Sequence, residues 1–196
     1  MPAGASMDKP HTLDQILAAT IEELEQRGIN GLRIRNVAER AGLSPGTVTH
    51  YYPTVQHLLD AAIEPFQQQS WQLLSTHPFF AGKSTLDQLL TEYYELCRDN
   101  RELVRARFFL TAREGSVSDT NWRQSLEPFL ARLDRAYGPA ARLYGHTIVL
   151  LAMRLAFHSD DELLAICGTN DPEVAHAMVV EHLVALAASG PWSAAT

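Results

Sequence analysis

Apolar residues recur three and four positions apart along most of this 196-residue chain. Near its start, Leu13, Ile16, Leu17, Ile21 and Leu24 follow this spacing, which places them on one face of an α-helix. No stretch alternates with period two, and no Asn-Gly or Asp-Gly hairpin turn joins two β-branched runs, so the sequence does not indicate strands. The periodicity therefore predicts an all-α fold.

Capping residues divide the chain into helices. Thr12 and Gln15 have the spacing of a capping box, and Gly28 suits the end of that first helix. A short second helix is expected from Ile34 to Gly42, and a third begins where Ser44 and Pro45 supply an N-cap and a first-turn proline. Longer helices are predicted over residues 54–74, 84–98, 101–114, 121–137, 140–158 and 172–188. Pro65 lies inside the first of these and predicts a kink there.

Composition excludes several classes of protein. The formal net charge of −7 argues against nucleic acid as a partner when it is taken over the whole chain. The two cysteines, Cys97 and Cys167, stand far apart in no metal-binding pattern, which indicates free thiols and a cytoplasmic protein. The longest apolar run, 148–153, is too short to span a membrane, for which about 20 residues are needed.

No motif of an enzyme or a cofactor site is present. The sequence contains no GxSxG, GxxxxGK[ST], GxGxxG or HExxH, so we expect neither catalysis nor a bound cofactor. Eight histidines are scattered without ligand spacing; His176 and His182 are six positions apart, and the acidic residues after His158 are typical of a solvated helix cap or loop. We therefore expect no metal site.

The most informative segment is residues 28–59. Two short helices joined by Ala41-Gly42-Leu43 have the form of a helix-turn-helix, whose second helix can enter a DNA major groove. The unpaired N–H groups at the start of that second helix attract phosphate. Between Arg27 and Val55 the chain has four arginines and one glutamate, so this segment is locally positive. The alternative interpretation is an ordinary helical turn in which Ser-Pro only caps a helix.

The residues of this segment resemble a known signature. The run Ala38-Glu39-Arg40-Ala41-Gly42-Leu43-Ser44, followed by Gly46-Thr47 and His50-Tyr51-Tyr52, is similar to the DNA-binding motif of the TetR family of bacterial transcriptional regulators. The resemblance implies a flexible tail over residues 1–10, a helix-turn-helix DNA-binding domain over 11–53 and an effector-binding and dimerisation domain over 54–196. It also implies a homodimer on a palindromic DNA operator, most often a repressor released by a small-molecule effector.

Carried over position by position, the resemblance implies a set of DNA-contacting residues. In the family, the positions of Thr47 and His50 commonly contact phosphates, and that of Arg35 reaches a base in some members. The full implied set is Arg33, Arg35, Ser44, Pro45, Gly46, Thr47, Thr49, His50 and Tyr51. This sequence has Arg33, Thr49 and Val55 where the family usually has a capping hydroxyl, a tyrosine and a lysine, so we expect fewer ionic contacts with DNA.

Two late segments, 148–157 and 174–188, are apolar on nearly all sides. Pairing them with the same segments of a second subunit would cover them in a four-helix bundle, which is also how the family dimerises. The expected interface residues are Ile148, Leu151, Leu155, Val179, Leu183 and Leu186. The alternative is that these are the innermost helices of a monomer.

The resemblance also implies a ligand pocket between helices of the domain over residues 54–196. Its predicted lining is Phe66, Trp71, Tyr93, Tyr94, Arg107, Phe108, Trp122 and Met153, which favours a largely apolar effector. Arg107 stands in the apolar face of its helix and needs a partner there, which is either an internal carboxylate or an anionic effector. The sequence thus predicts a ligand-responsive DNA-binding regulator. The alternative is a helical dimer that binds a ligand or another protein and has weakened DNA binding.

Overall fold

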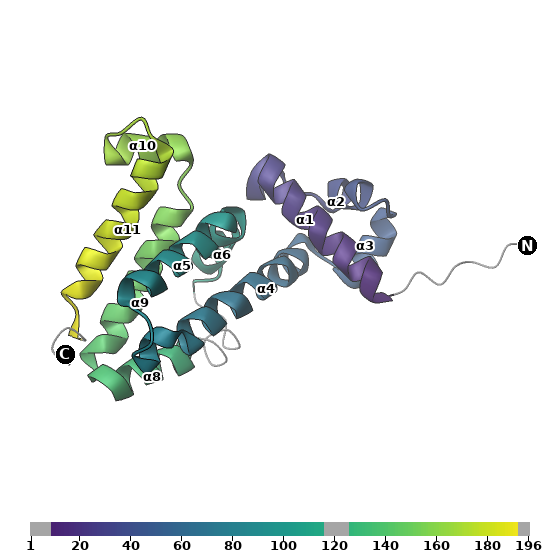
Figure 1. Cartoon of the computed structure of the whole chain (residues 1–196). Coiled ribbons are helices and arrows are strands. Elements are labelled where there is room, and N and C mark those ends of the chain that lie inside the picture. Colours follow the sequence, from purple (N-terminus) through teal and green to yellow (C-terminus); the bar gives the residue numbers. More distant parts are fainter. Residues whose placement is uncertain (1–8, 116–125, 192–196) are drawn as a thin grey trace, which may run out of the picture.

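A computed structural model describes residues 9–115 and 126–191 of the chain, and these residues form an all-α fold, as the periodicity predicts (Figure 1). The α-helices are α1 (Lys9–Gly31), α2 (Ile34–Arg40), α3 (Pro45–Tyr51), α4 (Val55–Thr76), α5 (Leu86–Asp99), α6 (Arg101–Glu114), α8 (Glu127–Tyr137), α9 (Ala140–Ala156), α10 (Asp160–Cys167) and α11 (Pro172–Ala188). One 3-10 helix, η1 (Pro78–Ala81), follows α4.

Helices α1, α2 and α3 pack together at one end of the molecule (Figure 1). Ile16 and Leu24 of α1 are buried, as the apolar stripe predicts. The helical path is interrupted at Gly28, where φ is +64°, so the glycine ends the regular part of α1 at the predicted position. The predicted start was wrong: α1 begins at Lys9, and Thr12 is a buried residue of the first turn instead of its N-cap.

Helix α4 connects this end to the rest of the chain (Figure 1). Thr54 caps it by accepting a hydrogen bond from the backbone N–H of His57, at 3.3 Å. The helix continues through Pro65 to Thr76 without ending. Its buried side chains include Leu58, next to α1, and Phe66, further along. One helix therefore reaches from the α1–α3 cluster into the larger helical body.

The larger body is built around α5, α9 and α11, which pack against one another. Helix α8 packs closely on α9, because Gly145 of α9 lacks a side chain where Leu133 of α8 approaches. The segment after His158 is a helix and not a loop: Ser159 and Glu162 form a capping box at the start of α10. Arg98 of α5 holds this corner by donating to Asp160 and to the carbonyl of Ala156.

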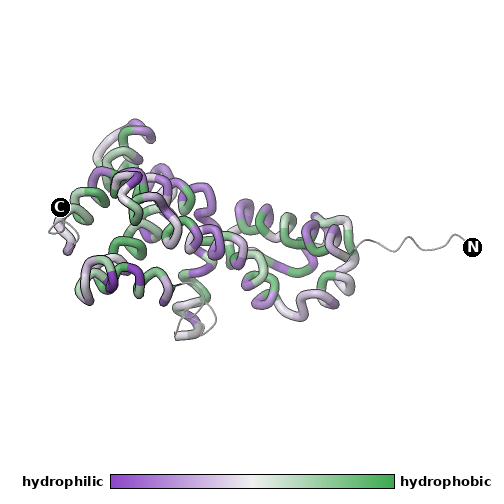
Figure 2. Tube along the Cα trace, turned by 60° about the horizontal axis from the view of Figure 1, so that its bottom comes forward, coloured by the Kyte–Doolittle hydropathy of each residue, from purple (hydrophilic) through white to green (hydrophobic). Residues whose placement is uncertain are grey.

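Each helix carries both hydrophobic and hydrophilic residues (Figure 2). The buried apolar residues form one cluster that includes residues from both ends of the molecule. Both cysteines are free thiols. None of the helices that the structure describes is long and apolar enough to cross a membrane.

Candidate nucleic-acid interface and ligand pocket

The turn between α2 and α3 has a defined geometry. Gly42 has a φ of +67°, and a Cβ there would have no atom within 4 Å, so the backbone conformation alone favours glycine. The N–H of Leu43 donates to the carbonyl of Ala38 at 2.9 Å. The Ser44 hydroxyl accepts from the N–H of Thr47 at 3.0 Å, with Pro45 in the first turn of α3. These bonds set the direction in which α3 leaves the turn.

Helix α3 presents one face to solvent and one to the core. Val48 is fully buried and anchors the helix. The exposed residues on or before α3 are Ser44, Pro45, Gly46, Thr49 and His50, and Thr47 and Tyr51 are half-buried. The hydroxyl of Thr49 donates back to the carbonyls of Pro45 and Gly46, at 3.0 and 3.1 Å. The predicted DNA-contacting residues of α3 are thus brought together on one accessible surface.

Two of the four arginines that make this segment positive form ion pairs with acidic residues of α1. Arg40 donates to Glu23 at 2.7 Å and to Glu22 at 3.1 Å, both in α1. Arg27 also pairs with Glu23, at 3.3 Å. Because the carboxylates of α1 neutralise these two side chains, the positive charge counted from the sequence overstates what the segment offers to phosphate. Among the described residues, neither of the other two arginines, Arg33 and Arg35, forms an ion pair with a carboxylate of α1.

Arg33 and Arg35 flank the start of α2 in different states. Arg33 donates to the backbone carbonyls of Asn30 and Leu32, at 2.9 and 2.8 Å, so it is held against the end of α1. Arg35 is exposed on α2. At the start of α4, His57 pairs with the Thr54 hydroxyl at 2.8 Å. Arg33 and Arg40 are thus held by contacts with α1, whereas Arg35 is exposed to solvent.

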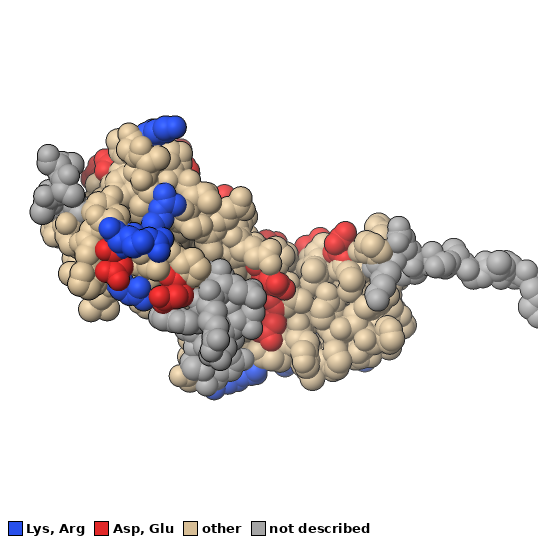
Figure 3. All heavy atoms as spheres, turned by 90° about the horizontal axis from the view of Figure 1, so that it is seen from below, with Lys and Arg blue, Asp and Glu red and all other residues tan. Residues whose placement is uncertain are grey.

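Charged side chains are unevenly distributed over the surface of the molecule. In the face seen in Figure 3, blue arginines and lysines gather over the larger body at the left, and the part at the right is mostly uncharged, with red acidic groups along its upper edge and at its border with the larger body. The exposed side chains of Ser44, Thr49 and His50 show that hydroxyls and a histidine ring make up much of the candidate DNA-binding surface.

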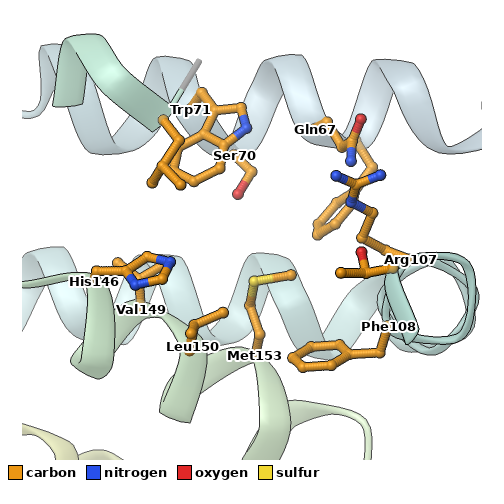
Figure 4. A pocket seen from close by; sticks show the side chains of 12 residues that line it. Gln67, Ser70, Trp71, Arg107, Phe108, His146, Val149, Leu150 and Met153 are labelled. Atoms are coloured by element: carbon orange, nitrogen blue, oxygen red, sulfur yellow. The ribbon is translucent and has the colours of Figure 1, made fainter. Parts of the chain in front are cut away.

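A cavity of about 110 Å³ lies between α4, α6 and α9, in the part of the larger body that α4 reaches (Figure 4). Its twelve lining residues are Phe66, Gln67, Ser70, Trp71, Arg107, Phe108, Thr111, Leu126, His146, Val149, Leu150 and Met153. Most of this wall is apolar. Figure 4 shows Arg107 and Gln67 directed toward each other at one end, and Trp71 opposite His146 at the other. Burial lowers the pKa of His146, so its ring is neutral at pH 7.

The structure brings five of the predicted pocket residues to this cavity: Phe66, Trp71, Arg107, Phe108 and Met153. Tyr93 and Tyr94 do not line it; both are almost completely buried on α5, and Tyr94 instead borders a separate hollow beside His176. Trp122 lies outside the described residues. The apolar spacing predicts that a helix face is buried. It does not distinguish aromatic residues that line the cavity from those that pack in the core.

Sequence reasoning missed seven lining residues. These are Gln67, Ser70, Thr111, Leu126, His146, Val149 and Leu150. A signal existed for the residues of α9, because positions 146, 149, 150 and 153 follow the three-and-four spacing of one helix face. The apolar run that surrounds them hid this face. No group of three or more His, Cys, Asp or Glu suited to a metal is found among the residues that the structure describes.

The predicted dimer residues divide by burial. Ile148, Val179 and Leu183 are buried within the chain itself, because α9 and α11 pack against α5 and each other. Leu151, Leu155 and Leu186 are half-buried. The exposed large apolar residues of the same two helices are Leu143, Leu150, Val174 and Met178. An interface formed by α9 and α11 would therefore use these four exposed residues more than the buried residues Ile148, Val179 and Leu183.

Comparisons with known proteins agree on one family. Residues 16–62 match the family model of bacterial regulatory proteins of the tetR family. The HTH-type transcriptional regulator BetI of Burkholderia thailandensis is 28% identical over 145 residues, which cover 72% of this chain and 68% of that protein. Other curated relatives align over as little as 58% of their own length.

Solved structures share the fold. A transcriptional regulator from Rhodococcus sp. Rha1 superposes with a TM-score of 0.66 at 16% identity, covering 91% of this chain and 97% of that one. A regulator of the TerR/AcrR family from Aquifex aeolicus VF5 gives a TM-score of 0.62 at 16% identity, covering 89% and 99% of the two chains. The likeness therefore extends over both the α1–α3 cluster and the larger body.

Proposed function

Because this chain is a DNA-binding transcriptional regulator of the TetR family, we propose that it acts as a repressor that a small, largely apolar effector releases from DNA. One observation carries the proposal: α4 begins directly after the candidate DNA-binding helix and also forms one wall of the cavity. A ligand in the cavity therefore acts on the same helix that positions α3.

The length of α4 makes this coupling mechanical. From Val55 to Trp71 the helix rises by roughly 24 Å, at about 1.5 Å a residue. It packs on α1 at one end of the molecule and on α5, α6 and α8 in the larger body (Figure 1). A ligand that separates α4 from α6 or α9 shifts the start of α4 and the orientation of α3 with it. The effector needs only to bind the released arrangement more tightly than the DNA-bound one.

The DNA-bound form is proposed to be a homodimer on a palindromic operator. A twofold dimer places two copies of α3 on half-sites about 34 Å apart, one turn of DNA. The exposed apolar residues Leu143, Leu150, Val174 and Met178 on α9 and α11 favour these helices as the interface, since a second copy would remove them from water.

Contacts with DNA are proposed for one cation and several neutral groups. Arg35 reads a base, and Thr47, His50 and Tyr51 contact phosphates, with help from the N-terminus of α3. Since Arg27 and Arg40 are paired with Glu23, few counterions are displaced on binding. We expect the logarithm of the binding constant to fall only shallowly with the logarithm of the salt concentration. The protein is proposed to act in the cytoplasm, where its DNA target is found.

A gel-shift titration tests the proposal. The DNA is the region upstream of the protein's own gene, and an unrelated duplex of the same length serves as the control. A repressor shifts the upstream DNA at lower protein concentration than the control, and Gly42→Pro, which disrupts the turn before α3, removes the difference. Equal binding to both duplexes, or to neither, would contradict the proposal and favour a ligand-binding or protein-interaction module.

A further inference from the structure

The end of the cavity formed by α6 contains polar and charged side chains, whereas most of the wall is apolar. Arg107 lines it there, with Gln67 beside it (Figure 4), and Thr111, one helical turn further along α6, is another polar lining residue. None of the twelve lining residues, all of which belong to the described part of the chain, is an aspartate or glutamate. Within this described wall, the fixed charge is that of one guanidinium.

Resting on the regulator function proposed above, we propose that the effector is a small monocarboxylate with a compact apolar body, and that Arg107 binds its carboxylate. The planar guanidinium matches a carboxylate with two parallel N–H···O bonds. In a site enclosed mainly by apolar side chains, such a bond is stronger than it would be in water. A cationic effector would find no carboxylate among the twelve lining residues to bind its charge.

The proposal does not require Arg107 to give up its contacts within the protein. A guanidinium has five N–H donors, so two can bind a ligand carboxylate while the others keep their partners. Figure 4 shows the guanidinium at the cavity between α6 and α4, and this position is what the proposal depends on.

The volume limits the size of the apolar body. A dry cavity of about 150 Å³ lined by aliphatic and aromatic residues holds one benzene molecule, and this cavity measures about 110 Å³. One aromatic ring or a short branched chain therefore suits it, with small movements of side chains such as Met153, which adapts readily to shape. Phe66 and Trp71 supply the aromatic surface on α4.

The end of the cavity near His146, away from Arg107, favours an effector with a single negative charge. His146 stands about two turns of α9 from Met153, roughly 10 Å along the helix. Because burial lowers the pKa of His146, its ring faces the cavity as a neutral group. A dicarboxylate would bring a second negative charge to this neutral, partly buried end, where the twelve described lining residues include no second lysine or arginine to bind it.

Three probes of one size separate charge from shape: benzoate, benzyl alcohol and benzylammonium. Each is titrated into the full chain at pH 7.5 by calorimetry. We expect benzoate to bind at least about tenfold more tightly than either of the other probes. Arg107→Gln should lower benzoate affinity about 10- to 100-fold, the usual effect of losing a charged hydrogen-bond partner. It should leave the affinity for benzyl alcohol nearly unchanged.

Two further variants keep the result interpretable. Arg113→Gln changes an exposed arginine of the same helix that does not line the cavity, and it should bind benzoate as the wild type does. Arg107→Lys retains the charge but loses the paired geometry, so it should keep part of the preference for benzoate. If Arg107→Gln does not fold by circular dichroism, Arg107→Lys and the three probes on the wild type decide the matter.

The inference is overturned if the wild-type chain binds the three probes equally, prefers benzylammonium or binds none of them. It is also overturned if folded Arg107→Gln keeps its benzoate affinity. The gel shift is carried out without any probe, so the two proposals fail separately. Operator binding without benzoate binding refutes only the effector class, and benzoate binding without operator binding refutes only the regulator.

Discussion

Arg40 of α2 donates to one carboxylate oxygen of Glu23 in α1 through two nitrogens, Nε at 3.0 Å and Nη2 at 2.7 Å. The Glu23 side chain is only 2% exposed, whereas that of Glu22, the other acidic partner of Arg40, is 56% exposed. An arginine within the signature that resembles a DNA-binding motif thus fastens α2 to α1. In the structure, this arginine thus has a bonding role between two helices of the α1–α3 cluster.

This difference in burial predicts different costs for the two acids. Glu23→Gln removes the charged partner of Arg40 inside the domain and should lower the free energy of unfolding by about 1–3 kcal/mol. Glu22→Gln changes an exposed pair and should cost at most about 1 kcal/mol. Urea unfolding followed by circular dichroism measures both. Equal losses in the two variants would mean that the buried bond has no special weight.

The same pair predicts an acid-sensitive component of stability. The hydrogen bond from Arg40 is the largest cause that lowers the pKa of Glu23 from its ordinary value of 4.5. The unfolded chain therefore takes up this proton first. Stability from the pair is complete above about pH 4.5 and is lost as the pH falls through the lowered folded value. Arg40→Gln should flatten that fall relative to the wild type, as urea midpoints measured from about pH 6 to pH 3 would show. An unchanged pH profile would contradict this assignment.

Arg35 is the exposed arginine of α2, and its loss should act on specificity. Arg35→Ala should weaken operator binding by about 1–3 kcal/mol, the value of one good base contact, and should affect unrelated DNA less. Fluorescence anisotropy at a fixed salt concentration compares the two duplexes. Arg101→Ala, an exposed arginine on α6, is the matched control. The same loss on both duplexes would show a phosphate contact instead.

Gly42 predicts a test of the turn. Its φ of +67° lies in the left-handed region, which costs an ordinary L-residue about 1–2 kcal/mol. Gly42→Ala should therefore lower stability by about this amount, although nothing stands in the way of the added methyl group. Gly42→Asn should cost less, because asparagine tolerates this conformation. Thermal unfolding ranks the three proteins, and alanine at or above asparagine would refute backbone strain as the cause.

Gly145 is required for a steric reason and not for its backbone conformation. A Cβ at this position would overlap Cδ1 of Leu133, which is 3% exposed in the contact between α8 and α9. Gly145→Ala should cost about 1–3 kcal/mol through overpacking. Adding Leu133→Val should recover part of that loss, because it makes room for the methyl group. Gly46→Ala, at an open position in α3, should be neutral or stabilising. A double variant that is additively worse would exclude this contact as the cause.

Local sequence patterns predicted much of the fold. The Ser44-Pro45 start of α3, the Thr54 start of α4 and the bounds of α6 and α11 follow from signals a few residues long. Capping and apolar spacing are physical requirements of one helix with itself, so one segment suffices to see them. The first turn of α1 was predicted less well, since Thr12 lies inside the helix, and the segment of α10 was predicted only as a helix cap or a loop.

The functional surfaces depended on contacts that local patterns do not contain. Arg40 and Arg35 are both arginines of α2, five positions apart, yet one is bound to α1 and the other is exposed. Tyr93 and Trp71 are both aromatic residues on buried helix faces, yet only Trp71 reaches the cavity.

The chain's own residue order was thus enough for the helices, their caps and the turn that presents α3, since each depends on neighbours within about four positions. The identity of the accessible cations, the walls of the cavity and the exposed parts of α9 and α11 were decided by packing between segments 17 to more than 80 positions apart. Those contacts depend on how whole helices lie against one another. Burial and charge pairing, which follow from that arrangement, determine which side chains remain available for DNA and ligand.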